Sequence, residues 1–271
     1  MSTNFAVIGA TGKTGRRVAD LLETEGHPVR RLARRTSPAF DWEHPEHWAE
    51  ALQGVDRLYA AYLPDLAAPG SEAAITRLAE IADRVGVQRI VLLSGRGEDG
   101  ARRCEDILLA SNVPTAIVRA SWFAQNFTEG MLSDAAVTGV LALPAGNVRE
   151  PFIDVDDVAA VAVEALTGTG HEGRVHEVTG PESLTFAEVA AILSETTGRE
   201  ITFVPMELEV FHAAVAAEEG DAVATMLTGL CRETFDGRNV LPTDGVAAAL
   251  GRPPRDVRSV LTEAAAAAAR S

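Results

Sequence analysis

Near the start of the chain lies the stretch FAVIGATGKTG, residues 5–15, in which four apolar residues run into three evenly spaced glycines. The apolar residues predict a short buried strand. The spacing of Val18, Leu21 and Leu22 predicts a helix over residues 16–25. A strand, a glycine-rich turn and a helix in this order are typical of the first unit of a dinucleotide-binding α/β fold.

The three glycines have different expected tasks. Gly9 permits the tight turn after the strand, Gly12 lets the backbone approach a pyrophosphate, and Gly15 lets the helix pack closely on the strand. The free N–H groups at the start of the helix then face the phosphates. We therefore expect a dinucleotide to be bound by the whole turn, that is by Gly9, Thr11, Gly12, Lys13, Thr14 and Gly15.

The alternation of strands and helices continues to about residue 120. Further strands are expected at residues 29–32, 57–61, 89–93 and 115–118, with helices at 72–85 and 98–110. Short apolar strands that alternate with amphipathic helices predict a doubly wound parallel sheet, the Rossmann fold, which is covered by helices on both faces.

Beyond residue 120 the alternation loosens. Strands are expected at 151–154 and 174–178, and helices at 155–166, 186–197 and 208–218. We expect residues 1–150 to form the dinucleotide-binding Rossmann domain and residues 151–271 to form a smaller C-terminal α/β lobe for the substrate. The boundary is expected to be interleaved, because no linker rich in proline, glycine or serine separates the halves. Such a lobe would cover the carboxyl edge of the sheet, where open α/β sheets bind ligands.

Composition excludes several classes of protein. The 271 residues carry a formal net charge of −15, so the surface repels nucleic acids and anionic lipid headgroups. Two cysteines without a CxxC pair argue against a disulfide framework and a zinc site. Neither an apolar run of about 18 residues nor a signal peptide is readable in the sequence. We expect a cytoplasmic protein without metal, nucleic-acid or membrane partners, and a homodimer stays open.

The expected second strand is followed by two arginines. These are Arg34 and Arg35, and no acidic residue follows until Asp41. A carboxylate here would bind the ribose 2′-hydroxyl of NAD, whereas an arginine suits the 2′-phosphate of NADP through its charge and its forked donors. We therefore expect NADP(H) as the cofactor, with Arg34 as the first choice for the 2′-phosphate and Arg35 beside it. Lys13 and Thr14 are expected to help hold the same phosphate.

Together, these motifs resemble the NmrA-like family, a branch of the atypical short-chain dehydrogenase/reductases. The resemblance spans nearly the whole chain and includes GATGKTG at 9–15, GVDRL at 54–58, RIVLLS at 89–94, IVRASWFAQNF at 117–127, PFIDVDDVA at 151–159, TDGV at 243–246 and LGRPP at 250–254. Members of this family include NADPH-dependent quinone reductases, triphenylmethane and isoflavone-type reductases, ergot-alkaloid iminium reductases and non-catalytic NADP sensors. The resemblance therefore implies NADP(H) and leaves the reaction open.

The acid–base pair of standard short-chain dehydrogenases is missing. Those enzymes use Tyr-x-x-x-Lys, whereas the segment after Ser94 holds no tyrosine or lysine, and the chain has only Tyr59 and Tyr62. Ser94 ends an expected strand at the carboxyl edge of the sheet, so it is the candidate catalytic residue and a candidate cofactor contact. Tyr62 is a second candidate cofactor contact. Each of the two side chains is equally compatible with an ordinary structural role.

Four residues after the expected strand at 115–118 are candidates for substrate binding. By the resemblance, they lie beside the nicotinamide and form an aromatic wall with one polar group; they are Trp122, Phe123, Asn126 and Phe127. At least one of them is expected to be ordinary packing. On the helix expected at 98–110, the acids are predicted to form a solvated face from which only Glu98 could reach the cleft; they are Glu98, Asp99, Glu105 and Asp106.

Three functions stay open. The first is an NADP(H)-dependent oxidoreductase that transfers a hydride between the nicotinamide and a small organic acceptor of the quinone, enone or iminium type. Such acceptors need little acid catalysis, so positioning would supply most of the rate. The second is a non-catalytic NADP(H) redox sensor that acts through a protein partner. The third, an isomerase or epimerase, is disfavoured because reversible oxidation of an alcohol needs a base.

Overall fold

The centre of the molecule is a sheet of six parallel strands in the order β2-β1-β3-β4-β5-β8. The computed structural model describes residues 3–270. The strands are β1 (Phe5–Ile8), β2 (Val29–Leu32), β3 (Arg57–Ala60), β4 (Arg89–Gly95), β5 (Thr115–Ala120) and β8 (Val175–Val178). β1 pairs in parallel with both β2 and β3, so the direction of winding reverses at β1. This topology confirms the predicted Rossmann fold.

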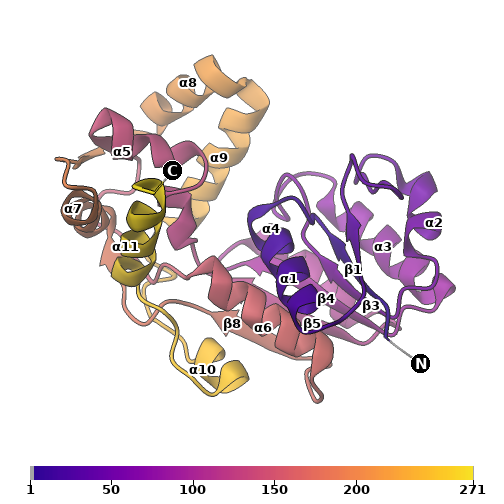
Figure 1. Cartoon of the computed structure of the whole chain (residues 1–271). Coiled ribbons are helices and arrows are strands. Elements are labelled where there is room, and N and C mark those ends of the chain that lie inside the picture. Colours follow the sequence, from indigo (N-terminus) through magenta and orange to yellow (C-terminus); the bar gives the residue numbers. More distant parts are fainter. Residues whose placement is uncertain (1–2, 271) are drawn as a thin grey trace.

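Helices cover both faces of the sheet (Figure 1). One face carries α1 (Lys13–Thr24), α6 (Val155–Thr167) and α10 (Gly245–Leu250), and the other carries α2 (Trp48–Leu52), α3 (Ser71–Val85) and α4 (Asp99–Leu109). A short 3-10 turn, η1 (Pro45–His47), leads into α2. The two-layer cover explains why the inner strands β1, β4 and β5 contain continuous buried apolar runs, whereas the edge strands β2 and β8 are only partly buried.

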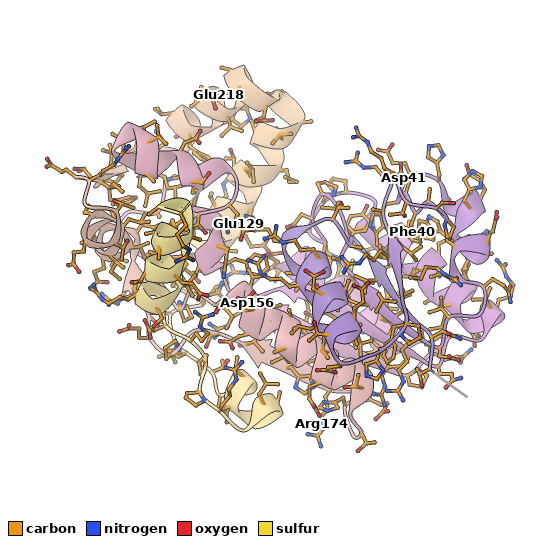
Figure 2. All side chains as sticks on the ribbon, in the orientation of Figure 1. Phe40, Asp41, Glu129, Asp156, Arg174 and Glu218 are labelled. Carbon is orange, nitrogen blue, oxygen red and sulfur yellow. The ribbon has the colours of Figure 1, made fainter. Side chains whose placement is uncertain are left out.

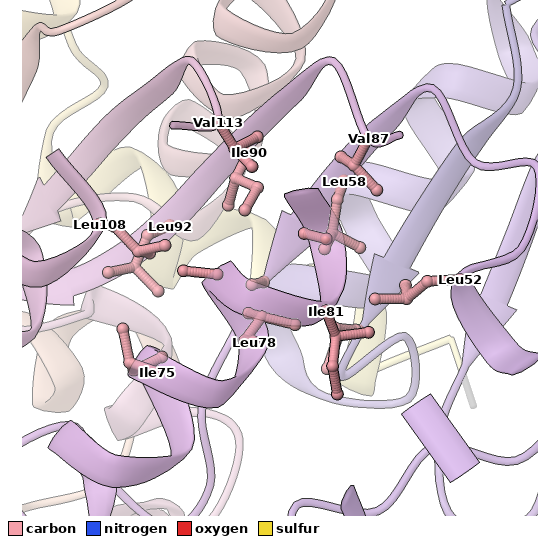
Figure 3. Close-up of a cluster of buried hydrophobic side chains, with 14 of the residues drawn as sticks. Leu52, Leu58, Ile75, Leu78, Ile81, Val87, Ile90, Leu92, Leu108 and Val113 are labelled. Carbon is pink, nitrogen blue, oxygen red and sulfur yellow. The ribbon is translucent and has the colours of Figure 1, made fainter. Parts of the chain in front are cut away.

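Along the inner strands, alternate side chains belong to two separate hydrophobic cores. In β1, Ala6 and Ile8 join the core under α2, α3 and α4, whereas Val7 joins the core under α1 and α6. Figure 3 shows the first of these cores, in which Leu58 and other strand residues meet Leu78 of α3. Full burial of one such side chain contributes about 1.5–3 kcal/mol, so the two faces hold the sheet firmly.

A second lobe lies beside the sheet body (Figure 1). It contains η2 (Ala124–Phe127), η3 (Met131–Asp134), α5 (Ala135–Thr138), β6 (Val140–Leu143), β7 (Arg149–Glu150), β9 (Leu184–Thr185), α7 (Phe186–Thr197), β10 (Thr202–Pro205), α8 (Leu208–Glu219), α9 (Asp221–Thr234) and α11 (Val257–Ala268). Two small sheets, β10–β6 and β7–β9, lie in this lobe. Its core is a third cluster centred on Phe127, Phe152 and Phe186, whose rings contact one another edge to face.

The chain passes repeatedly between the two bodies. Residues 124–152 pack in the second lobe, residues 153–178 return to the sheet body through α6 and β8, and residues 184–235 lie in the lobe again. Near the middle of Figure 2, Glu129 of the lobe and Asp156 of α6 lie close together, and Arg17 of α1 forms ion pairs with both carboxylates. Within residues 3–270, none of the helices combines the length and apolarity needed to cross a membrane.

Candidate cofactor and substrate site

The glycine-rich turn between β1 and α1 has the geometry of a phosphate cradle. Gly9 adopts a left-handed conformation with a φ of 78°, which suits glycine because it has no Cβ. A Cβ on Gly15 would lie 2.2 Å from the carbonyl oxygen of Gly9, so only glycine lets α1 approach the turn this closely. No side chain caps α1 at Gly12. The first N–H groups of the helix therefore stay available to an anion, and the turn fits a dinucleotide diphosphate.

A cavity of about 420 Å³ extends from this turn along the carboxyl edge of the sheet. It brings together nine of the residues that the sequence singled out: Gly9, Gly12, Lys13, Thr14, Tyr62, Ser94, Trp122, Phe123 and Asn126. Thr11, Gly15, Arg34, Arg35 and Phe127 do not line it. The carboxyl edge is where a parallel sheet presents its loops to a ligand, so the cavity lies where the topology places a dinucleotide.

Arg34 and Arg35 lie in the turn that follows β2, and both are exposed. Thr36 holds this turn: its hydroxyl accepts the N–H of Ala33 at 2.9 Å and donates to the carbonyl of Pro38 at 2.8 Å. Within residues 3–270, neither arginine side chain forms a hydrogen bond or an ion pair. Both guanidinium groups are therefore available to an external anion.

Lys13 links the glycine-rich turn to the second lobe. Its ammonium group donates to the Oδ1 atom of Asn126 at 2.7 Å. Burial lowers the pKa of Lys13, although the charge of Glu129 works in the opposite direction. The expected role of Lys13 beside Arg34 at a 2′-phosphate stays a prediction, but the structure directs its side chain toward Asn126 of η2.

Ser94 lines the cavity, but its hydroxyl is already engaged. Only 4% of the residue is exposed, and its Oγ donates to the Oε1 atom of Glu105 at 2.6 Å. Glu105 in turn accepts the Nε proton of Arg119 at 2.9 Å. The prediction that Glu105 lies on a solvated helix face is wrong, because this carboxylate is buried under β4 and β5 and neutralised by Arg119. Ser94 can accept a hydrogen bond from a ligand, but it could donate its proton only by leaving Glu105.

The aromatic wall contains two of the three predicted rings. Trp122 packs against Phe235 of the second lobe at a centroid distance of 4.8 Å, and its indole N–H donates to the hydroxyl of Thr234 at 3.3 Å. Phe123 also lines the cavity, but Phe127 does not. Phe127 is 1% exposed and forms part of the lobe core, so its expected place beside the substrate has to be corrected. Its sequence position next to cavity residues does not distinguish the two faces of the short η2 turn.

Tyr62 is a rim residue of the cavity. Its ring lies 4.8 Å from that of Trp42, and burial raises the pKa of its phenol. Because the raised pKa keeps the phenol protonated, Tyr62 can donate a hydrogen bond but is not an activated acid. The other tyrosine, Tyr59, is fully buried under the sheet and does not line the cavity.

Sequence reasoning missed one wall of the cavity. Asp65, in the loop after β3, is not among the predicted site residues, and Glu98 is predicted only as an acid that could reach the cleft. Both carboxyl groups line the cavity, together with Arg96 and with Leu230 of α9. Burial and the neighbouring Asp65 raise the pKa of Glu98 well above its usual range, and burial also raises the pKa of Asp65. The only available signal was that each acid follows a strand at the carboxyl edge.

Comparisons with known proteins agree with this architecture. A model of the NmrA-like family matches residues 1–229. The (4-alkanoyl-5-oxo-2,5-dihydrofuran-3-yl)methyl phosphate reductase of Streptomyces griseus subsp. griseus is 33% identical over 96% of this chain and 98% of that protein. The NAD(P)H azoreductase of Xenophilus azovorans is 30% identical over 92% of this chain and 91% of that protein.

The fold is shared with solved structures as well. An NADPH-dependent quinone oxidoreductase from Escherichia coli, solved with NADPH, matches with a TM-score of 0.80 over 96% of this chain and 99% of that chain. Its sequence identity of 22% supports the shared fold and nothing finer. The resemblance that the sequence motifs predicted is confirmed by the family match over the sheet body and most of the second lobe. The chain belongs to the NmrA-like family.

Proposed function

We propose that this protein is an NADPH-dependent reductase that transfers a hydride to a small conjugated organic acceptor. One observation carries the proposal: a single cavity joins the phosphate cradle at Gly9 and Gly12 to an aromatic wall at Trp122 and Phe123. A dinucleotide held at the first end would extend its reactive ring toward the second. The two curated relatives, which are named as reductases, support the same class of reaction.

The residues present fit NADPH. The cradle would hold the diphosphate, and the free guanidinium groups of Arg34 and Arg35 would hold the 2′-phosphate through charge-assisted hydrogen bonds. When bound, the coenzyme supplies a hydride. Lys13 and Asn126 form a polar bridge across the cavity and would orient whatever lies between the cradle and the aromatic wall. The NADPH in the E. coli neighbour and the NAD(P)H of the azoreductase name support a nicotinamide coenzyme.

The acceptor is proposed to be an electron-poor conjugated compound. The chain lacks a Tyr-x-x-x-Lys pair, and the proton of Ser94 is held by Glu105. An unactivated ketone is therefore a poor candidate, because its reduction needs strong acid help. Conjugated acceptors delocalise the electrons that arrive with the hydride. The name of the S. griseus relative describes a dihydrofuranone whose ring double bond is conjugated with carbonyl groups, which supports this class.

The proposal places this chemistry in the cytoplasm, with a small molecule as the partner. The formal net charge of −15 makes nucleic acids and anionic membranes unfavourable partners. The structure of a single chain leaves a homodimer as an expectation.

The test is NADPH oxidation by the purified protein in single-turnover experiments. The acceptors would be an acyl-substituted butenolide, a quinone and a cationic triphenylmethane dye, each mixed with protein that has been loaded with NADPH. We expect rapid oxidation with at least one of them. Tight NADPH binding without oxidation by any acceptor would reject the reductase and favour the redox sensor. No NADPH binding at all would reject both functions.

A further inference from the structure

We propose that Asp65 and Glu98 form a proton-sharing carboxyl pair that protonates the acceptor after hydride transfer. This inference deepens the proposed function and depends on it, because a reduced neutral acceptor must take up a proton from somewhere. Neither the Tyr-x-x-x-Lys position nor Ser94 offers that proton. The pair lines the same cavity as Gly12 and Trp122 and so has access to a bound acceptor.

The backbone is shaped to hold the two acids together. The N–H of Ala67 donates to the Oδ1 atom of Asp65 at 2.7 Å, which fixes one oxygen of this carboxyl group. The side chain of Glu98 folds back over Gly95: a Cβ added to Gly95 would lie 2.0 Å from the Oε1 atom of Glu98. The loop of Asp65 lies close to α4, where a Cβ on Gly100 would lie 2.6 Å from the Cα of Ala67. Any larger residue at either glycine would displace one member of the pair.

The carboxyl groups of Asp65 and Glu98 lie in hydrogen-bonding contact with each other. Two carboxyl groups can form a hydrogen bond only if one of them carries a proton. The other charged groups near Glu98 are Glu233 of α9 and Glu105 of α4, and both favour its protonated form. Loss of the proton would leave two adjacent negative charges in a partly buried site. The pair therefore keeps its proton at pH values above those at which a carboxylic acid usually loses it.

The cations of the cavity wall are engaged elsewhere. Lys13 donates to Asn126, and Arg96 pairs with Glu177 at 2.8 Å and donates to the carbonyl of Asn239. Within residues 3–270, neither Asp65 nor Glu98 forms a salt bridge. A carboxyl pair without a neutralising cation is poorly suited to a purely structural role, since an ion pair would stabilise the fold better, but it is well suited to releasing one proton.

The proposed step balances for an enone. The hydride, two electrons with one hydrogen, forms a C–H bond at the β-carbon and moves the double-bond electrons onto the carbonyl oxygen. The O–H bond of Glu98 then breaks as its proton forms a C–H bond at the α-carbon, and the carbonyl is restored. The pair is left with a net charge of −2, and a proton from water returns it to its starting state. For a cationic dye the hydride alone completes the reduction, so no proton is needed.

The experiment compares these two classes of acceptor in Glu98→Gln. Glutamine keeps the size of the side chain and a hydrogen-bond donor toward Asp65 but has no transferable proton. We expect the single-turnover rate with an acyl butenolide to fall by about 10²-fold. The rate with a cationic triphenylmethane dye should stay within about threefold, as should the Kd for NADPH. Asp99→Asn removes an exposed neighbouring acid of the same helix and is expected to change neither rate.

Two further measurements report the protonation state of the carboxyl pair. Infrared spectra of the protein without coenzyme should contain a protonated-carboxyl band at neutral pH that Glu98→Gln removes, in addition to the band of Glu150, whose pKa burial raises to about 8. In the wild type the butenolide rate should fall as pH rises through the raised pKa of Glu98, because only the protonated pair is active. In Asp65→Asn that fall should move to lower pH, because burial still raises the pKa of Glu98 but the additional effect of the Asp65 charge is gone.

The possible outcomes distinguish failure of the carboxyl-pair proposal from failure of the proposed reductase function. An unchanged butenolide rate in Glu98→Gln would overturn the carboxyl pair, as would equal slowing with both acceptors or an infrared spectrum that Glu98→Gln leaves unchanged. Reduction of the dye alone by the wild type would also overturn it, since no protonation step would remain. A wild-type protein that binds NADPH and reduces neither acceptor would instead reject the proposed function.

Discussion

The cofactor end of the cavity and the acceptor end are built from different material. At the cofactor end, the lining residues Gly9, Gly12, Lys13 and Thr14 come from one turn, and the backbone itself forms the cradle. The acceptor end is formed by side chains from separate elements: Asp65 after β3, Glu98 before α4, Trp122 after β5 and Leu230 of α9. The first end depends on local chain geometry, whereas the second depends on how the two bodies pack.

The two ends are therefore sensitive to different kinds of substitution. A backbone cradle tolerates no added atoms, because its groups cannot move without unfolding the turn. A wall of side chains is more tolerant of a single change but responds to the charge and protonation of its neighbours. Substitutions at the two ends should therefore produce different kinds of defect, loss of coenzyme binding at one and dependence on pH at the other.

The largest effect is expected from Gly15→Ala at the cofactor end. The new Cβ would lie 2.2 Å from the carbonyl oxygen of Gly9, a backbone atom that cannot give way. The turn must open or α1 must shift, so we expect the affinity for NADPH to fall by at least about 10²-fold, together with a stability loss of about 2–4 kcal/mol. Isothermal titration and urea unfolding measure the two quantities.

A matched glycine provides the control for this variant. Gly229 lies within α9, and a Cβ there would meet no atom within 4 Å. Gly229→Ala should stabilise the protein by up to about 1 kcal/mol, because alanine favours a helix, and should leave NADPH binding unchanged. Equal loss of binding in both variants would mean that the close approach of α1 to the turn is not what shapes the cradle.

The next effect concerns Glu150, a buried acid of the second lobe. It is fully buried in β7, and neither of its carboxylate oxygens has a hydrogen-bond partner within residues 3–270. Burial raises the pKa of Glu150 from 4.5 to about 8, while the charge of Arg96, a cavity residue, opposes the rise. Unlike Glu105, which is neutralised by Arg119, this carboxyl group is held without a counter-charge.

The pH dependence follows from this raised pKa. Below pH 4.5 Glu150 is protonated in both the folded and the unfolded chain, so Glu150→Gln should change the free energy of unfolding little. As pH rises to 8, the unfolded chain loses the proton first and the wild type becomes less stable. We therefore expect the variant to gain up to roughly 4 kcal/mol over the wild type by pH 8, measured by urea unfolding at a series of pH values.

A surface glutamate provides the comparison for this variant as well. Glu218 lies at the exposed end of α8 (Figure 2). Glu218→Gln should shift stability by no more than about 0.5 kcal/mol at any of these pH values. A difference between Glu150→Gln and the wild type that stays constant from pH 5 to pH 8 would contradict the raised pKa.

The same contrast explains what the sequence could and could not predict. The succession of strands and helices along the chain, the two helical layers and the cradle follow from periodicity and from three glycines within seven residues, all of which are local signals. Phe127 and Glu105 were misplaced for a common reason. Each lies beside residues with the opposite environment, and only tertiary contacts, with Phe152 and with Arg119, decide which way the side chain points.

The carboxyl pair could not be predicted for a related reason. Asp65 and Glu98 lie in different βα loops, and nothing in the sequence around either one indicates that they meet. Gly95 at the end of β4 and Gly100 in α4 leave room for the two acids, but a single glycine in a strand or helix has many other uses. Burial of an acid depends on which segments cover it, and here one of those segments is α9, which contributes Glu233 and lies far along the chain.

The weakest effect is predicted at the cofactor end, for a side chain that is proposed to bind the 2′-phosphate. Arg34 is exposed and without a partner within residues 3–270, so Arg34→Ala should not disturb the fold. If its guanidinium group binds the 2′-phosphate, the variant should bind NADPH about tenfold more weakly, a loss of about 1.4 kcal/mol, and bind NADH as before. Fluorescence titration with both coenzymes measures the ratio of the two affinities.

Arg84→Ala, which removes another exposed arginine from α3, controls for the change in net charge and should alter neither affinity. Because the contact would be an exposed ion pair, the NADPH preference should also shrink as salt is raised in the wild type and not in Arg34→Ala. If Arg34→Ala still binds NADPH more tightly than NADH, Arg35 or Lys13 must bind the 2′-phosphate instead. The cofactor end would then depend, like the acceptor end, on side chains that are positioned by long-range packing.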